Sequence, residues 1–156
     1  MKEIIKGITF QEYYLTIIRI SVFLDYLGSD HKKSTTEDRL VLYDFYLKFP
    51  ELTNDNTQNL DFDTKYSYFH WKPNYKLYSA ILADLYGRKL VSYSKENKRY
   101  YISELGTEFV ANMKNPYTET SYTLSEYISK NICQLSNKAI IADIDKILLK
   151  KRGSIN

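Results

Sequence analysis

The chain has 156 residues, of which 44% are hydrophobic and 26% are charged, and its net charge is +3. This length suits one domain with a sizeable core. No apolar run approaches the roughly 20 residues of a membrane-spanning helix, and the charged N-terminus does not look like a signal peptide. The single cysteine, Cys133, excludes an internal disulfide. We therefore expect a cytoplasmic protein without a membrane role, in which Cys133 is a small buried residue.

The charge is spread unevenly along the chain. Residues 1–70 carry 8 Lys and Arg against 11 Asp and Glu, a net charge of −3, whereas residues 71–156 carry 14 against 8, a net charge of +6. A basic half can favour polyanions, although an ordinary solvated surface explains it as well. The 16 tyrosines suit both protein interfaces and half-buried helix faces. They indicate partners without identifying them.

The first predicted helix covers residues 9–27. Thr9 and Glu12 have the spacing of a capping box, and Gly28 is the expected stop signal. Apolar residues lie on more than one side of this helix, so we expect it to pack against two neighbours. One of those neighbours can be another chain.

A second helix is expected to open at a capping box formed by Ser34 and Glu37 and to close at Pro50. Residues 51–73 then form a long loop, first acidic and then aromatic, which we interpret as functional or ordered by a partner. Its carboxylates lack the spacing of a calcium loop, and His70 has no second ligand at metal spacing. We predict no metal site.

A third helix and a hairpin follow this loop. Pro73 fits the first turn of a helix that runs to Tyr86 and ends at Gly87. Alternating β-prone residues over 90–93 and 99–102 then predict a hairpin.

Three helices are predicted after the hairpin. Ser103 is the expected N-cap of a helix over 104–113, in which Gly106 allows close packing. The chain then breaks at a proline, and two helical patterns follow over 119–134 and 137–151.

This order of elements is that of a winged helix-turn-helix. We predict a mainly α protein with a small β-hairpin wing, an α+β fold in a single domain. Residues 9–27 form its N-terminal helix, residues 34–113 its winged-helix core with the long loop 51–73, and residues 117–152 its C-terminal helices. The same fold serves DNA readers and protein-docking subunits, so it leaves the function open.

A DNA reader would place the helix before the wing in the major groove. That helix offers one basic residue and no arginine on its expected exposed face, and Asp84 would repel phosphate. These features argue against base reading. The wing is better supplied with charge, and it either holds a DNA backbone non-specifically or keeps a hairpin tip in water. The candidates for DNA contact are Lys76, Arg88, Lys89, Lys95, Lys98 and Arg99. The expected exposed residues of the helix are Tyr75, Lys76, Ser79, Ala83 and Tyr86.

No catalytic motif stands out. The sequence has no Gly-rich phosphate loop, no His-Glu-x-x-His, no paired cysteines and no nucleophile-elbow serine, and its histidines, His31 and His70, lie in different predicted loops. We predict no enzymatic activity, no catalytic residue and no cofactor. Any ATPase or nuclease chemistry would come from another chain.

Three stretches of residues 39–113 resemble a known family. They are "RLVLYDFYLKFP", "YKLYSAILADLYGRKLVSY" and "RYYISELGTEFVANM". Their order and pattern are similar to those of the middle components of bacterial ABC-three-component systems, a group that includes the small subunit of the Lamassu anti-phage defence system. Here the approach to the wing is Arg88-Lys89-Leu90-Val91 rather than the Gly-Leu-Ile of that group.

The resemblance implies a non-catalytic adaptor in an anti-phage or anti-plasmid complex, which bridges an SMC- or Rad50-like ATPase and an effector such as a nuclease. Contact of the wing with double-stranded DNA is a further hypothesis. The alternative is a winged-helix transcriptional regulator that binds DNA as a homodimer. The first and last helices are the expected docking elements. The candidates for the partner interface are Tyr13, Tyr14, Ile17, Phe23, Tyr26, Tyr75, Tyr86, Ile140, Ile144 and Leu148.

Overall fold

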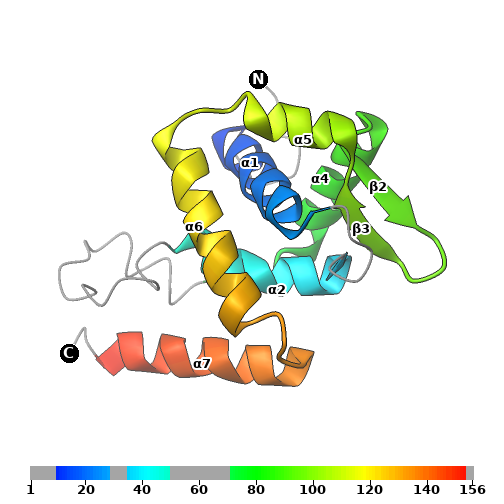
Figure 1. Ribbon diagram of the computed structural model, residues 1–156. Helices are drawn as coiled ribbons and strands as arrows, with labels where there is room; N and C mark the ends of the chain where they lie inside the picture. The colour runs from blue at the N-terminus through cyan, green and yellow to red at the C-terminus, as the bar shows by residue number, and fades with distance from the viewer. Residues whose placement is uncertain (1–9, 29–34, 50–70, 154–156) are drawn as a thin grey trace.

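The computed structural model describes residues 10–28, 35–49 and 71–153. Over these ranges the protein is mainly helical, with a small antiparallel sheet (Figure 1). This agrees with the α+β class expected from the sequence. The helices are α1 (Phe10–Leu27), α2 (Glu37–Lys48), α4 (Tyr75–Gly87), α5 (Glu104–Ala111), α6 (Pro116–Asn131) and α7 (Asn137–Gly153). The strands are β1 (Thr35–Thr36), β2 (Val91–Ser94) and β3 (Arg99–Ile102).

Helix α1 is the centre of the fold. Figure 1 shows it enclosed by α5, α6, α2 and the sheet side of the molecule, and it contacts α2, α4, α5, α6 and β3. Its residues from Thr16 to Leu24 are all buried. This explains why its sequence is apolar on several sides, as predicted.

The sheet has the strand order β1-β3-β2, with both pairs antiparallel. The predicted hairpin is confirmed as β2 and β3, in which Tyr93 faces Tyr100 with ring centroids 4.7 Å apart. Strand β1 was not predicted. It comprises only two residues, and Thr36 pairs with Arg99 across a long sequence separation.

Two helix starts differ from the prediction. Helix α2 is capped by Thr36, whose hydroxyl accepts a hydrogen bond from the Arg39 amide at 3.4 Å, and not by Ser34, which lies outside the described residues. Helix α4 is capped by Asn74, whose side chain accepts from the Leu77 amide at 3.0 Å. The expected Pro73 therefore lies just before the helix. The side chain of a polar N-cap residue accepts a hydrogen bond from a backbone amide of the first turn. Proline fits near a helix start but makes no such bond.

The start of α5 agrees with the prediction. The Ser103 hydroxyl accepts from the Gly106 amide at 3.0 Å and donates to the Lys89 carbonyl at 2.7 Å. A Cβ at Gly106 would collide with the backbone oxygen of Leu90 and lie 2.6 Å from the Ile102 side chain. Glycine at this position thus lets α5 lie directly on the base of the hairpin.

The C-terminal helices pack around α2. Helix α6 begins at Pro116, three residues before the predicted start, and Asn115 is its N-cap. Helix α7 packs against α2 (Figure 1). Tyr46 of α2 donates a 2.6 Å hydrogen bond to Asp143 of α7. Thr9 of the first predicted capping box lies outside the described residues, and so do residues 50–70, which include most of the predicted long loop.

Candidate functional site

An apolar groove lies between the start of α1, the end of α4 and α5. We call it the α1–α4–α5 groove; its volume is about 290 Å³. Phe10 and Tyr14 form its rim, each 48% exposed, with ring centroids 6.3 Å apart. The groove is thus an accessible apolar surface beside a well-packed core. Its lining comprises Phe10, Tyr13, Tyr14, Ile17, Asp84, Leu85, Arg88, Leu90 and Phe109.

The polar groups of this groove are paired with one another. The Asp84 carboxylate accepts from the Tyr13 hydroxyl at 3.0 Å and from Arg88 Nε at 2.8 Å. Burial, followed by the hydrogen bond to Asp84, raises the pKa of Tyr13 to about 12. Because these groups satisfy each other, an apolar partner that enters the groove meets no unpaired charge among them.

The predicted interface residues divide into four sets in the structure. Tyr14, Tyr75 and Tyr86 are exposed, and Tyr13 and Ile17 are buried but line the α1–α4–α5 groove. The structure therefore brings Tyr13, Tyr14 and Ile17 together at one place. Two further candidates are partly buried and pack against the core: Tyr26 and Leu148. Three lie inside the core of this chain and have no exposed surface to offer: Phe23, Ile140 and Ile144.

The candidate DNA contacts are not all equivalent. Five of them are exposed, and Arg99 is partly buried. Arg88 is held by Asp84, so part of its charge is neutralised locally. Lys89 and Lys98 have φ angles of 64° and 58°, a left-handed conformation that is uncommon outside glycine. The exposed set is Lys76, Arg88, Lys89, Lys95 and Lys98.

The exposed face of α4 matches the prediction in every position. Tyr75, Lys76, Ser79, Ala83 and Tyr86 are all exposed, and Lys76 is the only cation among them. The Ser79 hydroxyl also donates a 3.0 Å hydrogen bond to Glu37, which places a carboxylate beside this face. The face is therefore better suited to a protein surface than to base edges and phosphates.

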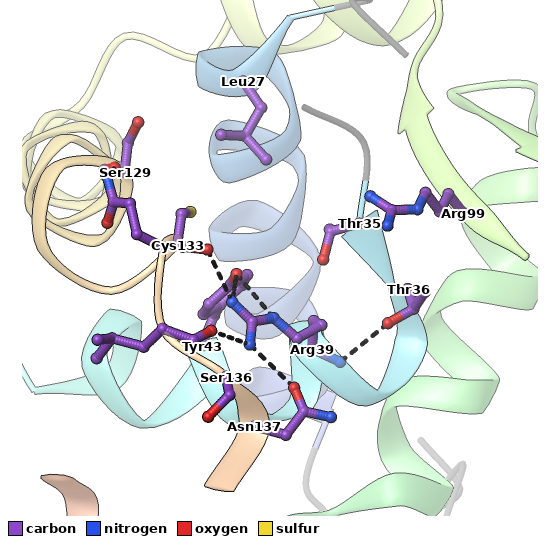
Figure 2. Close-up of a pocket in the computed structure, with 12 residues that line it drawn as sticks. Leu27, Thr35, Thr36, Arg39, Tyr43, Arg99, Ser129, Cys133, Ser136 and Asn137 are labelled. Carbon is purple, nitrogen blue, oxygen red and sulfur yellow. Dashed lines mark hydrogen bonds between the residues drawn. The ribbon is translucent and has the colours of Figure 1, made fainter. Parts of the chain in front are cut away.

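The structure also contains a pocket that the sequence did not indicate. We call it the arginine pocket; it has a volume of about 700 Å³ and lies between the N-termini of α2 and α7 and the start of β3, next to the hairpin turn. Figure 2 shows Arg39 in its middle, with Arg99 entering beside Thr35 from the strand side. Its other polar lining residues include Thr36, Ser136 and Asn137.

Arg39 holds the link between α6 and α7 in place. Its guanidinium donates to the carbonyls of Cys133 at 3.0 Å and Leu135 at 2.6 Å, and to Asn137 Oδ1 at 2.9 Å (Figure 2). It also lies over the Tyr43 ring and donates to the Tyr43 hydroxyl. Only the spacing of Arg39 and Tyr43 is visible in the sequence, because the other acceptors lie 94 to 98 residues away.

Cys133 borders this pocket. Its side chain packs against the core but is only partly buried, whereas a buried residue was expected from the sequence. Burial raises the pKa of the Cys133 thiol, which disfavours the reactive thiolate. Over the described ranges, no three His, Cys, Asp or Glu side chains gather where they would hold a metal ion. The described helices also include none that is long and apolar enough to cross a membrane.

Comparison with known proteins identifies the family. Residues 17–153 match the family model of the ABC-three component (ABC-3C) system Middle Component 2. No match was found among curated proteins or among solved structures. The matched range includes α1 from Ile17 onward, the sheet, the arginine pocket and all of α7. The chain thus belongs to the Middle Component 2 family of ABC-three component systems.

Proposed function

We propose that this chain is a non-catalytic adaptor of a bacterial ABC-three component system. It bridges an SMC- or Rad50-like ATPase and an effector, such as a nuclease, in a cytoplasmic complex that acts against phage or plasmid DNA, as in Lamassu defence. The observation that carries this proposal is the family match over residues 17–153, because a middle component works with other components.

The α1–α4–α5 groove is the surface that supports docking best. It combines half-exposed aromatic residues, Phe10 and Tyr14, with a polar pair, Asp84 and Arg88, whose charges already satisfy each other. Aromatic side chains at such a surface contribute strongly to protein binding because they bury much area with little loss of conformational freedom. We propose that an apolar segment of the ATPase or effector subunit occupies it.

We further propose that the core is a winged helix that contacts DNA through its wing. The strand order β1-β3-β2 supports this, together with the position of α4 directly before the hairpin. Lys95 and Lys98 lie exposed at the tip. The weakly basic face of α4, next to Glu37, favours backbone contact through the wing over base reading. This also makes the homodimeric regulator the less supported alternative.

The proposal is tested by co-purification. The tagged chain is expressed with the other components of its system and purified. The molecular masses of the proteins that elute with it are then measured. We expect a large ATPase subunit in the eluate. A homodimer without a partner would contradict the adaptor role and favour the regulator.

Matched variants then locate the interface. Tyr14→Ala removes a side chain from the groove, whereas Tyr122→Ala removes one that is equally exposed, at 50%, on α6. We expect Tyr14→Ala to weaken partner binding by about tenfold or more and Tyr122→Ala to leave it nearly unchanged. An equal effect of both variants would exclude the groove as the interface.

A further inference from the structure

A second hollow continues the α1–α4–α5 groove along α5. We call it the α5 hollow; its volume is about 390 Å³. It shares Arg88, Leu90 and Phe109 with the groove, so the two form one surface, which we call the apolar track. Leu105 in the α5 hollow is 49% exposed, so half-exposed apolar side chains lie along both parts of the track. The α5 hollow is lined by Arg88, Leu90, Leu105, Glu108, Phe109 and Asn112.

The edge of the apolar track is acidic. Asp84 and Arg88 form an ion pair at 2.8 Å, so their charges largely cancel. Glu108 lines the α5 hollow, and together with Glu104 and Asp25 it also lines a further hollow beside the start of α5. Within the part of the chain that the structure describes, neither Glu104 nor Glu108 forms an ion pair. This edge is therefore negative, although the whole chain has a net charge of +3.

Helix stability explains only one of these two carboxylates. Glu104 lies in the first turn of α5, where the helix dipole stabilises an acidic side chain. Glu108 lies in the second turn, and the effect of the dipole fades beyond the first. Both side chains belong to exposed residues of α5. Glu108 therefore remains available for a cationic group of another molecule.

The track offers side chains rather than free backbone groups. The Leu90 N–H donates to the Leu85 carbonyl at 2.9 Å, and the Leu90 carbonyl accepts from the Ser103 amide at 3.2 Å. The other lining residues lie in α1, α4 and α5 or directly after them. An extended segment would find no row of backbone partners among these residues, whereas a helix satisfies its own backbone groups. The track thus fits a helix.

We propose that the apolar track binds a basic amphipathic helix of the partner subunit. The apolar face of that helix enters the groove and the α5 hollow, and lysines or arginines beside this face lie against Glu104 and Glu108. The inference deepens the docking function proposed above and rests on it, because that function supplies the partner. It adds the chemistry of the segment that docks.

The first test uses the full chain and two synthetic peptides that share one stripe of leucines at helical spacing. One peptide carries lysines beside the stripe, and the other carries glutamates. Two-dimensional NMR of the backbone amides should show a saturable shift of Leu105 and Phe109 with the lysine peptide, and binding of the glutamate peptide about tenfold weaker. Equal binding of both peptides, or no saturable shift, overturns the proposal. Shifts of the same amides with protein concentration alone also overturn it, since they assign the track to a second copy of this chain.

Two double variants separate the acidic edge from general surface attraction. Glu104→Gln/Glu108→Gln removes both carboxylates, and Glu119→Gln/Asp145→Asn removes the same charge from exposed positions of α6 and α7. The first is expected to weaken binding of the lysine peptide about threefold to tenfold at low salt, and the difference should fade at high salt. The second is expected to change binding by less than about twofold. Equal losses in the two double variants overturn the proposal.

The subunit that co-purifies with the chain provides the last test. Leu105→Ala shortens a side chain of the α5 hollow, and Ile141→Ala shortens one of similar exposure, 47%, on α7. We expect Leu105→Ala to weaken binding of the subunit about fivefold and Ile141→Ala to leave it nearly unchanged.

This last test distinguishes the inference from the function on which it rests. A subunit that is sensitive to Tyr14→Ala, but not to Leu105→Ala or Glu104→Gln/Glu108→Gln, overturns the basic helix and leaves docking in the α1–α4–α5 groove intact. The absence of any co-purifying subunit contradicts the adaptor function itself and, with it, this inference.

Discussion

Arg19 of α1 and Asp44 of α2 form a buried ion pair, in which Nε and Nη2 of the guanidinium each lie 3.2 Å from Asp44 Oδ1. Arg19 is 2% exposed, and it also donates to Thr16 at 2.8 Å and to Tyr117 of α6 at 3.0 Å. Burial alone would lower the pKa of Arg19, but attraction to Asp44, Tyr78 and Tyr117 and the hydrogen bond to Tyr117 together outweigh it and raise the pKa. Arg19 therefore stays charged and connects α1 with α2 and α6.

Replacing Arg19 by methionine is expected to destabilise the fold strongly. The change leaves Asp44 buried without its partner, which typically costs about 3–5 kcal/mol. Urea denaturation followed by circular dichroism measures the loss. The double variant Arg19→Met/Asp44→Leu removes both charges and should recover most of the stability.

Arg88→Met is the control for this prediction. It breaks the ion pair between Arg88 and Asp84, in which the Arg88 side chain is 67% exposed. Such surface ion pairs contribute little to stability. The denaturation midpoint of Arg88→Met should therefore stay close to that of the unmodified protein. Equal losses in Arg19→Met and Arg88→Met would show that burial of the first pair has no special role.

Local signals in the sequence predicted most of the element order. The hairpin, the Ser103 cap and the exposed positions of α4 depend on neighbouring residues, so the sequence pattern was sufficient. Strand β1 was missed because its two residues are a strand only through pairing with β3. Thr36 is both the last residue of β1 and the N-cap of α2, so the helix begins later than the predicted capping box at Ser34.

The candidate sites were only partly predictable. Tyr14 was predicted as an interface candidate, but no local pattern shows that it lies beside Asp84 and Arg88 in a groove. Phe23 looked the same in sequence and is buried, because α1 is covered on nearly every side. The Arg39 contacts with the α6–α7 link require the folded chain, so the arginine pocket left no signal beyond the nearby Tyr43.

Gly106→Ala is expected to destabilise the protein by about 1–3 kcal/mol, the usual effect of forcing a methyl group into a filled space. The new Cβ would meet Leu90 and Ile102 at the base of the hairpin, so the backbone must shift. Thermal unfolding measures the change. Gly87→Ala is the matched control, since nothing lies within 4 Å of a Cβ there and the residue ends a helix. A similar loss in both variants would contradict the packing role of Gly106.

Tyr46→Phe should loosen α7 from the rest of the fold. The change removes the 2.6 Å hydrogen bond to Asp143 while keeping the ring, and such a bond is worth about 1 kcal/mol. Hydrogen exchange should increase in α7 more than in α1, because α7 packs mainly on α2. Tyr122→Phe, on the exposed side of α6, should leave the exchange of α7 unchanged. An equal increase of hydrogen exchange in α1 and α7 of Tyr46→Phe would contradict this anchoring role.

Lys95→Gln and Lys98→Asn test whether the wing holds a DNA backbone. Asparagine suits position 98 because it tolerates the left-handed conformation there, so the turn should survive while the charge is lost. Binding to duplex DNA should weaken, and the slope of log K against log salt should fall by about 0.9 for each phosphate contact removed. Lys114→Gln, away from the wing, should leave the slope unchanged. An unchanged slope in the Lys95→Gln/Lys98→Asn double variant would mean that these lysines only keep the hairpin tip in water.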